Sequence, residues 1–174
     1  ADQVGHLASK AKDQNIYFVP AFTGLGAPYW DPDARGAIFG LLRDTGREEI
    51  ALAALESVGF QTRELLEAMI KDVEGMKTDD IKLRVDGGMT QSSLIMKILA
   101  NLTGVEIHVP NIQESTAKGV AWLAGMRIGL YSQLDVFEKE WALKEKFSPV
   151  LSSGARDKKY KGWKEAVGKT GTST

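Results

Sequence analysis

The sequence predicts an α/β fold with parallel strand pairing, and three features support this prediction. In the second half of the chain, two short runs rich in β-branched residues, 81–86 and 105–110, alternate with two segments of helical apolar periodicity. Such alternation of strands with helices of about 10 to 15 residues is typical of an α/β layer. A long helical segment lies before them, and 174 residues suffice for one domain with a real hydrophobic core.

The composition is ordinary for a globular protein and excludes several classes. Hydrophobic residues make up 43% and charged residues 26% of the chain, unlike disordered or fibrous proteins. A net charge of −1 offers no electrostatic attraction to nucleic acid or to an acidic membrane surface. The absence of cysteine excludes disulfides and thiolate chemistry. Without a long apolar run or a signal-peptide layout, we expect no membrane span and a cytoplasmic location.

The first part of the chain predicts a helix and two short strands around a loop. Residues 2–12 carry apolar side chains at helical spacing and predict a helix. Residues 16–22 are β-branched and aromatic and predict a strand, which Pro20 places at a sheet edge or a bulge. Residues 23–36 hold three glycines and two prolines and predict a long loop with unusual torsions. Residues 37–42 predict a second short strand.

The longest predicted helix covers residues 47–71. Its apolar residues recur in a helical rhythm, and Glu48 and Glu49 in the first turn favour the helix dipole. Gly59 in its middle costs about 1 kcal/mol relative to alanine. We therefore expect another element to pack closely against Gly59.

The rest of the chain predicts the alternating part and a helical end. After a linker at residues 73–80, helices are expected at about residues 91–102 and 115–128, one after each strand. Residues 133–163 predict a short charged helix, a loop and the start of a final helix. Residues 164–174 are polar at their end, and we expect them to form a flexible tail.

The first candidate site is the turn VDGG, where Gly87 and Gly88 end a strand just before a helix. Only glycine leaves room where a β-carbon would clash, so these residues could bring the main chain against an adenine or ribose. The alternative is a plain strand-to-helix turn that needs positive φ. The chain lacks the third glycine of the dinucleotide fingerprint and any G-x-x-x-x-G-K-[ST] sequence.

A second candidate is the long loop, which carries Tyr29 and Trp30 beside Asp31, Asp33 and Arg35. A long ordered loop in a compact domain is more often functional than decorative, so these side chains could form a binding surface. The equal alternative is that Trp30 lies over the core.

The remaining polar residues predict structural roles. Ser115 or Thr116 could cap the helix that follows, and Gly119 could pack closely against the adjacent strand. His6 and His108 are the only histidines and lack ligand or catalytic partners at a suitable spacing. No pair of carboxylates stands out as an acid and a base. From the residues alone, a complete active site is not visible.

Four segments resemble the C-terminal domain of the FGGY carbohydrate kinases, within the actin-like ATPase superfamily. They are residues 20–41, 48–69, 83–104 and 114–125. The family signature is matched by Gly36, Ile38, Gly40, Leu41, Glu49, Ile50, Ala53, Ala54, Leu55 and Glu56. The run GLGAPYWDP favours the glycerol kinases over xylulokinase-like relatives. The match extends from about Ile16 to Trp163.

The resemblance implies a ribonuclease-H-like C-terminal lobe, with a mixed sheet flanked by helices, that belongs to a longer protein. In this family ATP and glycerol meet in a cleft between two lobes, and magnesium bridges the phosphates. The family's catalytic aspartate lies in sequence before the point where this chain starts. We therefore expect a single domain without a catalytic residue, inactive by itself. Its implied partners are the N-terminal kinase lobe, ATP and glycerol, in an intact protein that is a homo-oligomer.

Three residues take nucleotide-binding roles by position in the family motif. Gly88 corresponds to the glycine that lies against the adenine, and Gly87 shapes the same turn. Ser92 stands where the family usually has an asparagine that contacts the adenine or ribose. A serine is shorter and cannot offer both an amide donor and a carbonyl acceptor. Lys118 also departs from the family, which usually has an apolar residue there.

Two other functions fit the same sequence. The chain could be the equivalent lobe of another FGGY sugar kinase. It could also be a non-catalytic binding or assembly module that keeps the actin-like architecture and uses the loop at Tyr29 and Trp30 as a protein interface.

Overall fold

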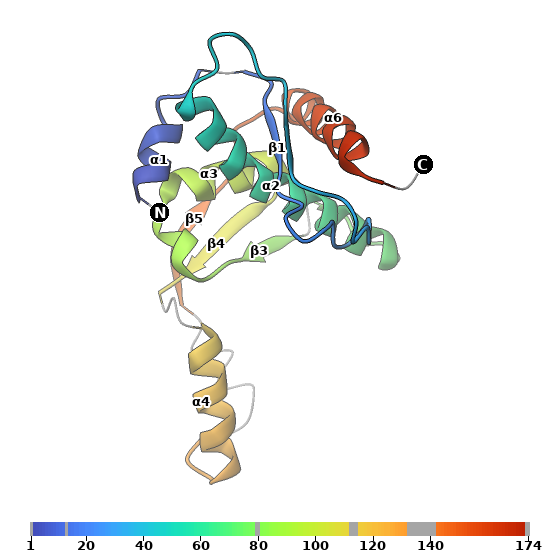
Figure 1. The fold of residues 1–174 in the computed structure, drawn as a ribbon. Coiled ribbons are helices and arrows are strands. Elements are labelled where there is room, and N and C mark those ends of the chain that lie inside the picture. Colours follow the sequence, from blue (N-terminus) through green and yellow to red (C-terminus); the bar gives the residue numbers. More distant parts are fainter. Residues whose placement is uncertain (1, 13, 79–80, 112–114, 132–141, 173–174) are drawn as a thin grey trace.

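The computed structural model of the chain describes residues 2–12, 14–78, 81–111, 115–131 and 142–172. In chain order, its elements are α1 (Asp2–Ala8), β1 (Tyr17–Val19), β2 (Ala37–Phe39), α2 (Arg47–Asp72), β3 (Lys82–Arg84), the 3₁₀ turn η2 (Gly88–Gln91), α3 (Ser93–Thr103), β4 (Glu106–Pro110), α4 (Ser115–Arg127), β5 (Leu143–Phe147) and α6 (Ser153–Thr170). Figure 1 shows α2 at the centre of this arrangement. Within the described ranges, no helix combines the length and apolarity that a membrane crossing requires.

The described strands form two small sheets. β1 and β2 pair antiparallel, while the second sheet has the order β3-β4-β5. β3 lies parallel to β4, as the strand and helix alternation predicts, and β5 lies antiparallel to β4. The second sheet is therefore mixed and flanked by helices, which confirms the predicted fold class. β1 ends at Val19, before Pro20, which has no N–H for a strand ladder.

The last third of the chain differs from the prediction in two places. No strand was expected in residues 133–163, but residues 143–147 form β5, and only the last of its five side chains is buried. Because the sequence LKEKF lacks a buried apolar alternation, its strand conformation rests on backbone pairing with β4. The tail expected from residue 164 is also wrong in its first part, since α6 continues to Thr170. The charged helix expected near residue 133 lies outside the described residues.

Two clusters of buried side chains lie along α2. The first lies between α2, α3 and the three-stranded sheet and includes Leu99 and Ile107. The second joins α2 to α6 and β1, and includes Phe60 and Trp163, each 1% exposed. The rings of Phe60 and Trp163 stack with their centroids 5.1 Å apart. The second cluster therefore fixes α6 onto the middle of α2.

The close packing expected at Gly59 is confirmed. A β-carbon on Gly59 would lie 2.8 Å from Cδ1 and 3.1 Å from Cβ of Leu102 in α3. Leu102 is itself buried, with 2% of its surface exposed. Glycine at this point lets α2 and α3 approach each other, which offsets its poor helix propensity.

Candidate functional site

The candidate nucleotide corner follows β3, where the chain turns towards α3. Gly87 has φ 91° and ψ 177°, a conformation that residues with a β-carbon rarely adopt. A β-carbon on Gly87 or Gly88 would meet no heavy atom within 4 Å. This positive φ is by itself a sufficient reason for glycine at position 87, as the plain-turn alternative requires. The open space at both glycines is the room that a flat ligand would need.

A short hydrogen-bonded turn holds this corner. The main-chain N–H of Thr90 donates to the carbonyl oxygen of Gly87 at 3.1 Å, and the Thr90 hydroxyl donates to the same oxygen at 2.7 Å. Thr90 is 7% exposed, so both bonds are shielded from solvent. The Ser92 N–H then donates to the carbonyl of Met89 at 3.2 Å. These bonds preorganise the two glycines.

Ser92 lies at the N-cap of α3, beside the glycine corner. It is half-buried, and its side chain makes no hydrogen bond to the helix N-terminus. Its Oγ lies 3.5 Å from the point where a β-carbon on Gly5 would stand, so the hydroxyl is next to α1. The structure thus brings the three residues Gly87, Gly88 and Ser92 into one turn.

The other polar residues singled out in the sequence lie elsewhere. His108, in β4, lies 3.3 Å from Oε2 of Glu106, whose pKa is lowered to about 2 by Lys146 first and then by His108. Thr116 lies inside α4, so it is not a cap, and the side chain of Ser115 lies outside the described residues. Gly119 is not a packing point, because a β-carbon there would meet no atom within 4 Å. Among the residues described, no three acidic or histidine side chains gather as metal ligands.

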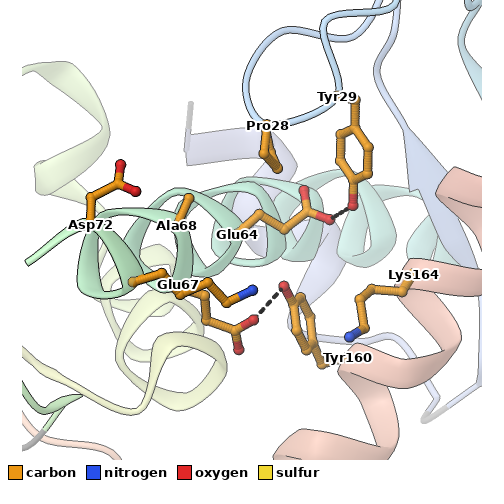
Figure 2. A pocket seen from close by; sticks show the side chains of 9 residues that line it. Pro28, Tyr29, Glu64, Glu67, Ala68, Asp72, Tyr160 and Lys164 are labelled. Atoms are coloured by element: carbon orange, nitrogen blue, oxygen red, sulfur yellow. Dashed lines mark hydrogen bonds between the residues drawn. The ribbon is translucent and has the colours of Figure 1, made fainter.

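A cavity of about 350 Å³ lies between the long loop, α2 and α6 (Figure 2). The loop contributes Pro28 and Tyr29, and α6 contributes Tyr160 and Lys164; the α2 residues are Glu64, Glu67, Ala68, Lys71 and Asp72. Trp30, next to Tyr29, points away from the core and is 76% exposed. The alternative in which Trp30 covers the core is therefore wrong.

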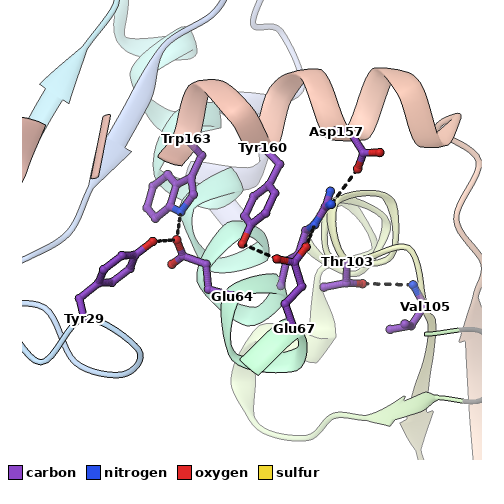
Figure 3. A network of polar contacts seen from close by, with 9 residues as sticks. Tyr29, Glu64, Glu67, Thr103, Val105, Asp157, Tyr160 and Trp163 are labelled. Atoms are coloured by element: carbon purple, nitrogen blue, oxygen red, sulfur yellow. Dashed lines mark hydrogen bonds and ion pairs between the residues drawn. The ribbon is translucent and has the colours of Figure 1, made fainter. Parts of the chain in front are cut away.

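Glu64 is the buried acid of this cavity, and sequence reasoning missed it. It is 5% exposed, and its Oε1 accepts hydrogen bonds from the Tyr29 hydroxyl and from Nε1 of Trp163, the latter at 2.8 Å (Figure 3). Burial raises the pKa of Glu64, and burial together with Glu64 raises the pKa of the Tyr29 hydroxyl. The sequence feature that could have indicated its burial is its position four residues after Phe60, on the same face of the helix.

A second acid in α2 joins the same helix to α6. Nε of Arg63 lies 2.8 Å from Oε1 of Glu67, and Nη2 lies 2.7 Å from Oδ1 of Asp157. The guanidinium lies 4.0 Å from the centre of the Tyr160 ring, whose hydroxyl donates to Glu67 at 3.1 Å (Figure 3). These contacts connect α2 and α6 without involving the loop.

Asp31 lies within the loop, directly after Trp30, and connects it to the residue Thr172. The pKa of Asp31 leads to a prediction about the pH dependence of stability. Its carboxylate accepts hydrogen bonds from the backbone and side chain of Thr172 and from the N–H groups of Ala34 and Asp33, which lower its pKa from 3.8 to about 2. Because the pKa is lower in the folded state, this stabilisation is present above pH 3.8 and is lost as the pH falls towards 2. Asp31→Asn should therefore be less stable than the parent chain near pH 7, with the difference shrinking between about pH 4 and pH 2.

Urea unfolding at several pH values, followed by circular dichroism, measures this difference. Asp33→Asn is the matched control, because Asp33 is two residues away and exposed. A gap between Asp31→Asn and the parent chain that stays constant from pH 7 to pH 2 would contradict the assignment.

Comparison with known proteins identifies the family. Residues 1–128 match the FGGY family of carbohydrate kinases, C-terminal domain. The chain is 50% identical to the glycerol kinase of Allorhizobium ampelinum over 174 residues, which are 99% of this chain and 35% of that protein. It is 53% identical to the glycerol kinase of Rhizobium rhizogenes over 167 residues, 95% of this chain and 34% of that one. The chain thus spans about a third of the length of these relatives.

Solved structures agree with this match. The crystal structure of Plasmodium falciparum glycerol kinase with ADP has a TM-score of 0.81 and 31% identity, covering 97% of this chain and 33% of that one. The gluconate kinase of Lactobacillus acidophilus has a TM-score of 0.80 at 23% identity, covering 99% of this chain and 35% of that one, which shows a shared fold. These neighbours are kinases with the actin-like ATPase fold. The chain belongs to the FGGY family of carbohydrate kinases and matches the C-terminal domain of that family.

Proposed function

We propose that the chain is the later part of the C-terminal, nucleotide-binding lobe of a glycerol kinase. The intact protein would transfer the γ-phosphoryl group of ATP to a terminal hydroxyl of glycerol. Glycerol kinases at about 50% identity and a related structure that holds ADP support this proposal. The observation that carries it for this chain is the open, hydrogen-bonded corner at Gly87 and Gly88.

In this proposal the corner binds the base of the nucleotide. Gly88 would lie against the flat face of the adenine, because a residue without a β-carbon permits close approach. Gly87 would keep the turn in its positive-φ conformation, and the Ser92 hydroxyl would offer one polar contact to the adenine or ribose. Phosphoryl transfer depends mainly on positioning and charge neutralisation, which ATP-bound magnesium supplies in the intact enzyme. The general base would come from the other lobe, so this chain alone would be inactive.

The proposal predicts that ATP binds weakly at this corner. In an NMR titration of the isolated chain with ATP and magnesium, amide shifts should centre on residues 87–92. Gly88→Ala should abolish these shifts yet fold normally, because a β-carbon there meets no protein atom and Gly88 does not have positive φ. Gly154→Ala, equally free of contacts but in α6, is the matched control and should keep them. Shifts that survive in Gly88→Ala would contradict the assigned pose.

A non-catalytic assembly module is the second candidate, favoured by the exposure of Trp30. It predicts no ATP-induced amide shifts at residues 87–92 and a concentration-dependent increase in mass by analytical ultracentrifugation.

The equivalent lobe of another FGGY kinase would also bind ATP, so substrate preference must separate it from a glycerol kinase lobe. Joined to its N-terminal lobe, the chain should phosphorylate glycerol faster than sugar acids or ketoses in an ADP-release assay. The isolated chain should show no turnover in that assay.

A further inference from the structure

We propose that α6 and the two residues after it form a C-terminal strap that holds the loop of residues 23–36 in its conformation. The strap reaches the loop at two fastening points, both of which use a carboxylate. It lies beyond the residues that match the family domain, which end at residue 128. The contacts that define it are made with α2 and the loop, and none of them involves residues 87–92.

The first fastening point is Glu64 of α2. One oxygen of its carboxylate accepts from Trp163 of α6 and from the hydroxyl of Tyr29 at the loop tip, so the acid connects the strap to the loop (Figure 3). Because Glu64 is 5% exposed, water competes poorly for these bonds. Tyr29 is therefore tied to the body of the domain at a shielded point.

The second fastening point is Asp31, on the other side of Trp30. Thr172, just beyond α6, donates its N–H to Oδ2 at 2.6 Å and directs its hydroxyl at Oδ1 and Oδ2 at 2.7 and 2.9 Å. The same carboxylate accepts the N–H groups of Asp33 and Ala34 at 3.1 and 3.0 Å. Asp31 is 7% exposed. One buried carboxylate thus joins the end of the chain to the turn of the loop.

The loop tip depends on these polar contacts because it has little apolar packing of its own. Residues 26–30 are all exposed, between the buried side chains of Leu25 and Asp31. Trp30 has φ 52°, a conformation that costs a residue with a β-carbon on the order of 1 kcal/mol or more. Such a conformation persists only where its neighbours are held firmly. Tyr29 and Asp31, the residues on either side of Trp30, are the two that are fastened.

The strap therefore controls whether Trp30 is presented in a fixed orientation. When the contacts at Glu64 and Asp31 are intact, the loop holds this large aromatic side chain in solvent, with 76% of its surface exposed. When the contacts at Glu64 and Asp31 are broken, Trp30 can return to negative φ and the loop tip can move independently of α2 and α6. The conformation of the loop therefore depends on the C-terminal strap as well as on the loop sequence.

Hydrogen exchange measured by mass spectrometry on the double variant Tyr29→Phe with Thr172→Val tests this inference. The variant removes the two hydroxyl contacts to Glu64 and Asp31 and keeps the rings, the chain length and the bond from the Thr172 N–H to Asp31, so any change in the loop reports the two hydroxyl groups. Amides of residues 25–31 should exchange at least about tenfold faster than in the parent chain, since the two lost hydrogen bonds together are of that order. Amides in α2 and β4 should keep their protection.

The matched control is Tyr160→Phe with Thr170→Val, which removes the same groups from the same region. Those hydroxyls donate to Glu67 and to the Ala166 carbonyl, so neither of the two bonds has a loop residue as its acceptor. The control should leave exchange at residues 25–31 unchanged. Equal loop exchange in the parent chain and the Tyr29/Thr172 variant would overturn the inference. So would an equal rise over all elements, because that reports global destabilisation instead of a released loop.

Discussion

Trp163→Ala is expected to lower the free energy of unfolding by about 3–5 kcal/mol, the range for large aromatic truncations in a core. Trp163 is 1% exposed and stacks on Phe60, so its removal leaves a cavity between α6 and α2. It also removes a hydrogen-bond donor from Glu64, whose buried carboxyl group then has one partner fewer. Urea unfolding followed by circular dichroism at 222 nm, which reports the loss of helix and does not rely on tryptophan fluorescence, measures the change.

Trp163→Phe separates packing from hydrogen bonding. Phenylalanine keeps a ring against Phe60 but has no N–H for Glu64, so it should cost less, about 1–3 kcal/mol. The exposed residue Trp30, replaced by alanine, is the surface control and should change stability by about 0.5 kcal/mol or less. A loss of under about 1 kcal/mol for Trp163→Ala would mean that α6 is not fixed by this side chain.

Local patterns sufficed where one segment determines the structure. The strand and helix alternation predicted β3, α3, β4 and α4, because the residue types within each short segment favour its own secondary structure. The glycine pair predicted the sharp turn, since positive φ at Gly87 is a property of one residue. Gly59 predicted a close neighbour because glycine in a helix needs compensation, although the sequence could not name Leu102.

Contacts between distant segments could not be predicted in this way. Glu64 meets Tyr29 and Trp163, which are 35 and 99 positions away, and Asp31 meets Thr172 across 141 positions. β5 has charged, exposed side chains and becomes a strand only by pairing with β4. The sequence therefore indicated the glycine corner of the candidate site, whereas the contacts between the loop and its strap join segments far apart in the sequence.

Gly40→Ala is expected to be the most damaging small substitution in the family signature. Gly40 has φ 84°, and a β-carbon there would lie 2.1 Å from the carbonyl oxygen of Asn15. The left-handed conformation costs about 1–3 kcal/mol, and the clash with main chain, which cannot rotate away as a side chain can, adds about 1–3 kcal/mol. We expect a total loss of about 3–5 kcal/mol in the free energy of unfolding, measured by urea denaturation.

Gly26→Ala distinguishes this cause from a general intolerance of alanine for glycine. A β-carbon on Gly26 meets no atom within 4 Å, and its φ is not positive, so this variant should stay within about 0.5 kcal/mol of the parent chain. If Gly40→Ala were equally mild, the segment around Asn15 would have to move aside at no cost in free energy. That result would contradict the pairing of Tyr17 with Phe39 in β1 and β2, which holds Gly40 against this segment. A large loss for Gly40→Ala beside a silent Gly26→Ala would assign the signature glycine to the close approach of two main-chain segments, a structural role independent of nucleotide binding.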